Sequence, residues 1–350
     1  MDRDPTPLDS IGEFGIIDRI KKSTELKNQS SILGIGDDAA IIASGEESTL
    51  ICTDTLVEGV HFDLLYTPLK HLGYKAVIVN LSDIYAMNAL PEQILVSLAV
   101  SNRMSVEGID EIYEGIRLAC DIYKVDLVGG DTTSSLSGTV ISITAVGKAL
   151  PKAITKRSGA KENDLICVSG DLGAAFMGLQ ILEREKQIFK ENSNIQPDLG
   201  GKDYILERQL KPEARKDIIE YFKKHSIQPT SMIDISDGLS SDLLHLAKSS
   251  AVGVQIYEDK LPLDVTTLAT AEELNLNPVM AALNGGEDYE LLFTVPINMH
   301  DQLKRAVGIT IIGHITEEAS GYFMVANGTE ELIELKAQGW DHGSARAAAQ

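Results

Sequence analysis

The chain has 350 residues, of which 43% are hydrophobic and 24% are charged. This is the composition of a globular protein of about two domains, and it excludes wholesale disorder. The 52 acidic and 31 basic residues give a formal net charge of −21, so we expect no binding to nucleic acid or to a membrane, because both need clustered Lys and Arg.

Strand-like runs alternate with helical patterns along the first half of the chain. Four runs rich in β-branched residues predict strands, at 49–57, 94–100, 126–128 and 139–146. Apolar residues recur at three- and four-residue steps over 105–124 and predict an amphipathic helix. A stretch with Pro, Gly and basic residues then predicts a linker. We therefore place an N-terminal domain at 1–150.

The second half repeats this alternation. Strands are expected at 165–168, 232–235, 252–257 and 289–295, and a polar surface loop at 190–203. The second domain accordingly spans 151–350, and the fold class is α/β (α+β).

Two short sequence motifs recur in the two halves of the chain. Asn80-Leu81-Ser82-Asp83 has a counterpart in Asp234-Ile235-Ser236-Asp237, and Gly129-Gly130 has one in Gly285-Gly286. The interval is nearly constant, which indicates two copies of one α/β unit facing each other across a cleft. The alternative is that such short sequence motifs recur by chance.

The residues 34–39 match the dinucleotide-binding pattern G-x-G-x-x-A. That pattern works because backbone N–H groups meet a pyrophosphate, and the adjacent carboxylates of Asp37 and Asp38 would repel one. A metal-binding turn fits better, since carboxylates supply hard oxygen ligands. An exposed acidic turn is the alternative.

Further carboxylates follow apolar runs and are expected at strand ends. They are Asp54, Asp83 after the run 77–81, Asp131 after two glycines, and Asp234 and Asp237 around Ser236. Singly, each is equally well a turn residue or a helix cap. Together they need counter-ions, and several Mg²⁺ ions are the simplest choice. The motifs of P-loop NTPases, zinc proteases and serine hydrolases are absent from the sequence.

Seven short sequence motifs follow one another along the chain: GIGDDAA, TDTLVEGVHF, NLSDIYAMNA, LVGGDTT, KRSGAKENDLI, MIDISDGLSSDL and GGEDYELLF. This set resembles the thiamine-monophosphate kinase family, within the superfamily of aminoimidazole-ribonucleotide synthetase. The resemblance implies two related α/β domains and a homodimer in which the N-terminal domains form a β-barrel. It also implies Mg²⁺-dependent transfer of the γ-phosphoryl group of ATP to thiamine monophosphate, giving thiamine diphosphate and ADP.

The resemblance also implies site residues. Those for Mg²⁺ are Asp37, Thr53, Asp54, Asp83, Asp131, Asp234 and Asp237. Those for ATP are Tyr113, Gly130, Asp131, Arg157 and Ser236. Those for thiamine monophosphate are His61, Glu287 and Trp340. Asp54, Asp131 and Arg157 would stabilise charge during transfer, whereas Cys52, a poor Mg²⁺ ligand, and Asp171 depart from the expected pattern.

The inferred nucleophile is a phosphate oxygen, which is already ionised, so neither a general base nor a phosphoenzyme is expected. Cys52, Cys120 and Cys167 have no disulfide or zinc spacing, the N-terminus has no signal-peptide pattern, and no apolar run reaches the ~18 residues of a membrane helix. We therefore expect a cytoplasmic protein. Two alternatives stay open: another ATP-dependent enzyme of the superfamily, or a non-catalytic acidic metal-binding protein.

Overall fold

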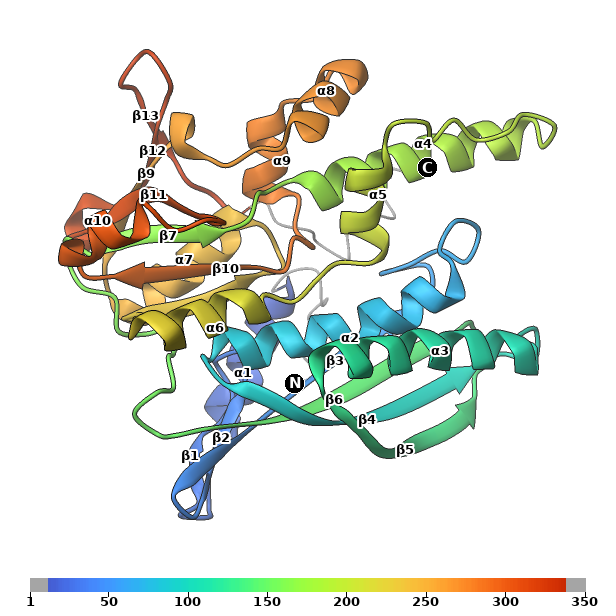
Figure 1. Ribbon diagram of the computed structural model, residues 1–350, viewed down its shortest axis with the longest axis horizontal. Coiled ribbons are helices and arrows are strands. Elements are labelled where there is room, and N and C mark those ends of the chain that lie inside the picture. The colour runs from blue at the N-terminus through green and yellow to red at the C-terminus, as the bar shows by residue number, and fades with distance from the viewer. Residues whose placement is uncertain (1–11, 338–350) are drawn as a thin grey trace, which may run out of the picture.

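A computed structural model of the chain describes residues 12–337. Its strands form a six-stranded sheet within residues 31–149 and a seven-stranded sheet within residues 165–334. Helices cover one face of the first sheet and separate it from the second half of the chain (Figure 1). The fold is therefore mixed α/β, as the alternating sequence pattern predicted.

The first sheet is mostly antiparallel, in the order β1-β2-β3-β6-β4-β5, and only β4 and β5 run parallel. Its strands are β1 (Ser31–Leu33), β2 (Ala40–Ser44), β3 (Glu47–Val57), β4 (Leu90–Val100), β5 (Asp126–Ser134) and β6 (Val140–Ala149). The helices of this half are α1 (Gly12–Ser23), α2 (Leu69–Ala86) and α3 (Val106–Tyr123).

The second sheet has the order β13-β12-β9-β11-β7-β10-β8, and in it only β12 and β9 run parallel. Its strands are β7 (Leu165–Ser169), β8 (Ser231–Ile235), β9 (Gly253–Tyr257), β10 (Glu290–Val295), β11 (Ile309–Thr316), β12 (Tyr322–Val325) and β13 (Leu332–Glu334). Its helices are α4 (Ala174–Glu191), α5 (Asp203–Leu210), α6 (Lys216–His225), α7 (Leu239–Ser250), α8 (Val265–Leu274), α9 (Pro278–Asn284) and α10 (His300–Leu303).

Helix α2 is the central element, because fourteen of its 18 residues are buried. It packs on α3 at very short range through two glycines. A Cβ on Gly73 would lie 1.9 Å from the carbonyl oxygen of Ile112, and one on Gly115 would lie 1.8 Å from that of Lys70. Any side chain at either position would therefore force the two helices apart.

A continuous hydrophobic core joins the two halves. Ile78 and Tyr85 of α2 belong to the same buried cluster as Phe222 of α6 and Phe293 of β10. The rings of Phe222 and Phe293 meet edge to face, with centroids 4.9 Å apart, an arrangement that adds to the energy of simple burial. This packing fixes α2 against the second sheet, and it thereby sets the geometry of any site that lies between the halves.

Three expectations from the sequence are corrected here. The run 77–81 lies inside α2, so Asp83 is a helical residue and not one at a strand end. A short apolar run does not by itself distinguish a buried helix from a strand.

The recurring sequence motifs also differ in structure, since Ser82 is helical whereas Ser236 follows strand β8. Strand β5 continues past the expected residue 128, because Gly130 allows an approach that would put a Cβ 1.8 Å from the Val96 carbonyl oxygen.

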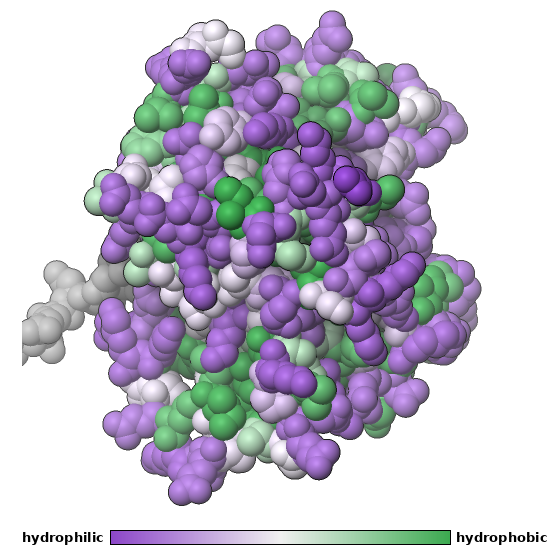
Figure 2. Space-filling view, turned by 60° about the vertical axis from the view of Figure 1, so that its left-hand side comes forward, coloured by the Kyte–Doolittle hydropathy of each residue, from purple (hydrophilic) through white to green (hydrophobic). Residues whose placement is uncertain are grey.

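Strand β5 lies at the edge of the first sheet, and all nine of its residues are exposed in this single chain. Apolar residues occur there too, since Val128 is 58% exposed. On the face drawn in Figure 2, hydrophilic residues dominate and the apolar ones form small separate groups. No helix within residues 12–337 is long and apolar enough to cross a membrane.

Candidate metal centre and substrate site

Three carboxylates meet between the two halves of the molecule. They belong to Asp38 in the turn between β1 and β2, to Asp83 on α2 and to Asp234 on β8, and one oxygen of each lies within 4.8 Å of the others. Asp38 and Asp234 are buried, and one buried oxygen of Asp38, Oδ2, has no hydrogen-bond partner. A buried acidic oxygen without a partner is costly unless a cation meets it.

Neighbouring side chains lie against two of these carboxylates. The Ser82 hydroxyl donates a hydrogen bond of 2.7 Å to Asp234 Oδ2. The Cys52 thiol donates to the carbonyl oxygen of Asn80 at 3.3 Å and lies beside the Asp83 carboxylate, whose charge adds to burial in raising the pKa of the thiol. Cys52 thus contributes to the site as a neutral neighbour of Asp83, which is a role that a soft sulfur atom fills without binding a hard cation.

Mutual repulsion and burial keep protons on this cluster. Burial raises the pKa of Asp83 well above its usual range, and the charges of Asp54, Asp234 and Asp38 act in the same direction. Burial, followed by the charge of Asp38, raises the pKa of Asp234 to about 7. A divalent cation would reverse both effects, because a bound cation is the largest local charge in such a site.

Arg157 binds the acidic turn at the edge of the cluster. Its Nη2 lies 2.6 Å from Asp38 Oδ1, and its backbone N–H donates to Asp37 Oδ1 at 3.2 Å. Burial opposes the charge on Arg157, but Asp38 and Asp37 outweigh it and hold the pKa of the guanidinium above its ordinary value. The sequence analysis selected Asp37 as a metal ligand, whereas the structure brings Asp38 into the cluster and uses Asp37 Oδ1 to accept two backbone N–H groups.

The remaining acidic residues of the second half lie close by. The backbone N–H of Asp237 donates to Asp242 Oδ2 at 3.2 Å, and Asp242 is itself buried. Burial, then the charges of Asp237 and Asp234, raise the pKa of Asp242 well above its usual range. The sequence analysis did not single out Asp242, although its position five residues after Asp237 in an acidic helix start was a usable signal.

Strand β3 carries two further expected ligands on opposite faces. The backbone N–H of Asp54 donates to Asn80 Oδ1 at 3.0 Å, and the charge of Asp54 raises the pKa of Asp83 after burial itself. The Thr53 side chain lies on the other face, where its hydroxyl donates to the carbonyl oxygen of Ile143 at 3.0 Å. The alternation of a strand therefore separates the Thr53 hydroxyl from the cluster.

The residues expected to contact ATP are spread over several elements. Tyr113 is half-buried on α3, Gly130 and Asp131 lie on the exposed strand β5, and Ser236 follows β8. Of these, the structure links Ser236 directly to another expected site residue, since its carbonyl oxygen accepts the backbone N–H of Glu287 at 2.7 Å.

The structure describes two of the three residues that were expected to contact thiamine monophosphate. Glu287 is held by Lys75 Nζ at 2.6 Å and lies near the acidic cluster, because Glu287, Asp54 and Asp234 all raise the pKa of the buried Tyr289 hydroxyl, after burial itself. His61 Nδ1 accepts the backbone N–H of Val57 at 3.0 Å, which leaves Nε2 as the protonated nitrogen of the neutral ring. Trp340 lies outside the described residues.

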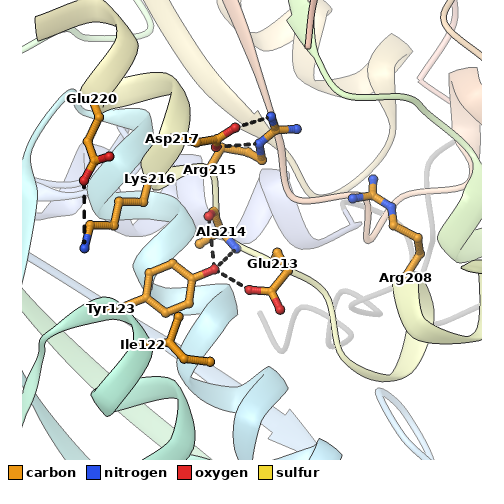
Figure 3. A pocket seen from close by; sticks show the side chains of 9 residues that line it. All are labelled: Ile122, Tyr123, Arg208, Glu213, Ala214, Arg215, Lys216, Asp217 and Glu220. Carbon is orange, nitrogen blue, oxygen red and sulfur yellow. Dashed lines mark hydrogen bonds and ion pairs between the residues drawn. The ribbon is translucent and has the colours of Figure 1, made fainter. Parts of the chain in front are cut away.

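A separate cavity of about 500 Å³ opens beside the end of α3 (Figure 3). The Tyr123 hydroxyl lies 2.6 Å from Glu213 Oε2, and Arg215 Nη2 lies 2.7 Å from Asp217 Oδ2. None of the expected site residues lines this cavity. The Tyr123 hydroxyl also accepts the backbone N–H of Ala214 at 2.9 Å, so these contacts connect the segment before α6 to α3.

Comparison with known proteins now bears on this geometry. Residues 36–149 match the family model described as AIR synthase related protein, N-terminal domain, a span that includes Asp38 and Asp83. A thiamine-monophosphate kinase of Aquifex aeolicus is 36% identical over 335 residues, covering 96% of this chain and 99% of that protein. The chain belongs to the thiamine-monophosphate kinase family.

Other comparisons agree with this family. The thiamine-monophosphate kinase of Escherichia coli K12 is 35% identical over 345 residues, covering 95% of this chain and 98% of the relative. A solved structure, AaThiL complexed with AMPPCP and TMP, superposes with a TM-score of 0.81 at 34% identity and covers 97% of this chain and all of that one. The expectation of a thiamine-monophosphate kinase family member is thereby confirmed, and with it the mixed α/β fold of that family.

Proposed function

We propose that this protein is a thiamine-monophosphate kinase that transfers the γ-phosphoryl group of ATP to thiamine monophosphate, giving thiamine diphosphate and ADP. The observation that carries the proposal is the cluster of Asp38, Asp83 and Asp234, which gathers residues from both halves of a chain similar throughout to such kinases. The solved AaThiL complex, with AMPPCP and TMP, supports the same pair of substrates.

We further propose that the acidic cluster holds several Mg²⁺ ions. The donor set consists of carboxylate oxygens, which Mg²⁺ prefers, and the partnerless buried oxygen of Asp38 together with the raised pKa values of Asp83 and Asp234 fits a site built for cations. Asp38, Asp83 and Asp234 would hold the metal, with Asp37, Asp54, Asp131 and Asp237 as further proposed ligands, whereas the Thr53 hydroxyl lies on the opposite face of β3 and is not among them. Bound Mg²⁺ would neutralise phosphate charge during transfer.

The protein's own residues orient the substrates in this proposal. Arg157, half-buried beside Asp38, offers a fixed cation to the phosphates of ATP, and Tyr113, Gly130, Asp131 and Ser236 contribute to the same nucleotide site. The phosphate of thiamine monophosphate is ionised near neutral pH and attacks directly, so no side chain needs to act as a base. Transfer then occurs in line without a phosphoenzyme, and catalysis consists of alignment and charge stabilisation.

We also propose a homodimer built on the first sheet. The support is strand β5, which has nine exposed residues at a sheet edge and exposes Val128 and Leu127. An open edge with apolar residues is a liability in a monomer. Pairing of two such sheets would give the barrel that the family resemblance implies. The domain division at 1–150 and 151–350 and a cytoplasmic location, with three free cysteines, belong to the same proposal.

The release of ADP tests this function. Purified protein, ATP and Mg²⁺ should release ADP only when thiamine monophosphate is present, and thiamine diphosphate should form in equal amount. ADP release that depends on another phosphate acceptor would favour a different enzyme of the superfamily. The absence of ADP release with any such acceptor, together with intact Mg²⁺ binding, would favour a non-catalytic metal-binding protein.

A further inference from the structure

Lys75 is a buried lysine with a single carboxylate partner. Only 3% of its surface is exposed, and it lies on α2, the helix that also carries Asp83. Its Nζ donates to Glu287 Oε2 at 2.6 Å and to the carbonyl oxygen of Gln209 at 2.9 Å. Lysine is rarely buried this deeply unless it is paired, so the contact with Glu287 accounts for its presence here.

A second donor reaches the same oxygen of Glu287. Gln209 Nε2, on α5, donates to Glu287 Oε2 at 2.9 Å. Among the hydrogen bonds of residues 12–337, none reaches Oε1 of Glu287, and the side chain is 26% exposed. One carboxylate oxygen is therefore held by two donors from two helices, and the other faces solvent.

The charge of this arrangement limits what Glu287 can recognise. The Lys75 ammonium neutralises the carboxylate at 2.6 Å, so the pair presents no net negative charge to a ligand. What remains is an acceptor, Oε1, with a fixed direction. Such a group selects a ligand that carries an N–H donor, and it does little for a cation that has none.

We propose that Lys75 is a positioning residue that fixes Glu287 so that Oε1 accepts a hydrogen bond from an N–H donor on the substrate's ring system. This inference rests on the proposed function. In thiamine monophosphate the exocyclic amino group of the pyrimidine is such a donor, whereas the thiazolium ring carries a positive charge and no N–H. Lys75 and Gln209 thus determine specificity for the aminopyrimidine end of the substrate.

Steady-state kinetics of four variants test the proposal. Lys75→Met removes both hydrogen bonds and the charge, Glu287→Gln leaves an amide N–H₂ where the acceptor was, and the double variant combines them. Lys70→Met is the control, because Lys70 lies on the same helix but pairs with Glu114 at the surface. KM for thiamine monophosphate and for ATP, and kcat, are measured for each, together with Tm.

Lys75→Met should raise KM for thiamine monophosphate by about 10- to 100-fold, the range of a hydrogen bond to a charged group. KM for ATP should change by less than about twofold, since the lost hydrogen bond contributes to binding of the other substrate only. The double variant should match Glu287→Gln alone, because Lys75 acts only through that side chain. Lys70→Met should behave as wild type.

The proposal would be overturned if the effects of the two single substitutions on KM for thiamine monophosphate multiply in the double variant. It would also be overturned if Lys75→Met raises both KM values and lowers Tm. In either case Lys75 is a packing residue only. If Lys75→Met does not fold, Gln209→Leu removes one donor from Oε2, and it should still raise KM for thiamine monophosphate selectively. An unchanged KM in that variant would overturn the proposal equally. A wild-type protein without turnover would instead refute the proposed function, and the positioning role with it.

Discussion

Ser82 and Asp234 are separated by 152 residues, yet the Ser82 hydroxyl donates a hydrogen bond of 2.7 Å to Asp234 Oδ2. Both residues are buried, one on helix α2 and one on strand β8. The bond therefore joins the two halves of the chain at the acidic cluster itself. It also favours the ionised form of Asp234, since an accepted hydrogen bond stabilises a carboxylate.

Removal of this hydroxyl should weaken metal binding and folding together. Ser82→Ala leaves a buried carboxylate oxygen without its donor, which costs about 1–3 kcal/mol of unfolding free energy. The pKa of Asp234 should rise above its value of about 7, so Mg²⁺ affinity at pH 7 should fall. Ser231→Ala on the same strand is the matched control, because the Ser231 hydroxyl bonds to Thr294 at 2.7 Å and not to the cluster. Equal Mg²⁺ affinities in the two variants would contradict this reasoning.

The adjacent residues Asp37 and Asp38 should respond differently to the same substitution. Asp38→Asn removes a carboxylate from the cluster, and turnover should fall on the order of 100-fold. Asp37→Asn keeps a side-chain carbonyl oxygen that still accepts the two backbone N–H groups, so its effect should be much smaller. Turnover at saturating Mg²⁺ distinguishes them. A larger loss in Asp37→Asn than in Asp38→Asn would show that Asp37 is the more important ligand of the two.

Binding of Mg²⁺ should release protons. Asp234, with a pKa raised to about 7, and Asp83, with a pKa well above its usual range, hold protons that a metal must displace. Affinity for Mg²⁺ should therefore increase from pH 6 to pH 8. Calorimetric titration in two buffers of different ionisation enthalpy measures the protons directly. Identical heats in the two buffers would mean that the carboxylates are already ionised in the free protein.

Asp288 should make the fold less stable as the pH rises. It is fully buried beneath the start of α4, and burial raises its pKa to about 7, so its charged form is disfavoured in the folded state. The stability present at low pH is lost as the pH approaches 7, by roughly 2 kcal/mol between pH 5.5 and pH 8. Asp288→Asn should lack this loss, because an amide does not titrate in this pH range. The variant should still fold, since the amide oxygen can accept the backbone N–H of Gly173.

Urea unfolding of the wild type and of Asp288→Asn at both pH values measures this difference. All other titrating groups are shared, so the change in the gap between the two proteins reports Asp288 alone. A gap that is constant with pH would show that Arg208, 3.8 Å from Asp288 Oδ1, keeps the carboxylate ionised throughout.

The sequence predicted most elements because their patterns are local. The stripe of apolar residues at 105–124 corresponds to α3, and the β-branched run at 49–57 corresponds to most of β3. Helix α2 was missed because it is buried nearly all round and therefore shows no amphipathic period. Asp83 and Asp234 were among the predicted ligands, and the structure brings them together with Asp38. Which of the adjacent Asp37 and Asp38 faces the cluster depends on the direction of one turn, which spacing does not encode.

Contacts between distant segments could not be predicted from the sequence, because they leave no local sequence pattern. No local pattern joins Lys75 to Glu287, 212 residues away, or Ser82 to Asp234, 152 residues away. Trp340 lies outside the described residues, and its contact with thiamine monophosphate stays a prediction.

The backbone around Glu287 has a consequence for attempts to stabilise the protein. Glu287 has a φ of 59° and Tyr289 a φ of 51°, a left-handed conformation that glycine adopts freely and other residues adopt at a cost of about 1 kcal/mol or more. Glu287→Gly would relieve this strain, but it would also leave the buried Lys75 ammonium without its carboxylate, which costs about 3–5 kcal/mol. The left-handed backbone at position 287 is therefore a strain that a glycine cannot remove with a gain in stability, because the side chain held there pairs a buried charge.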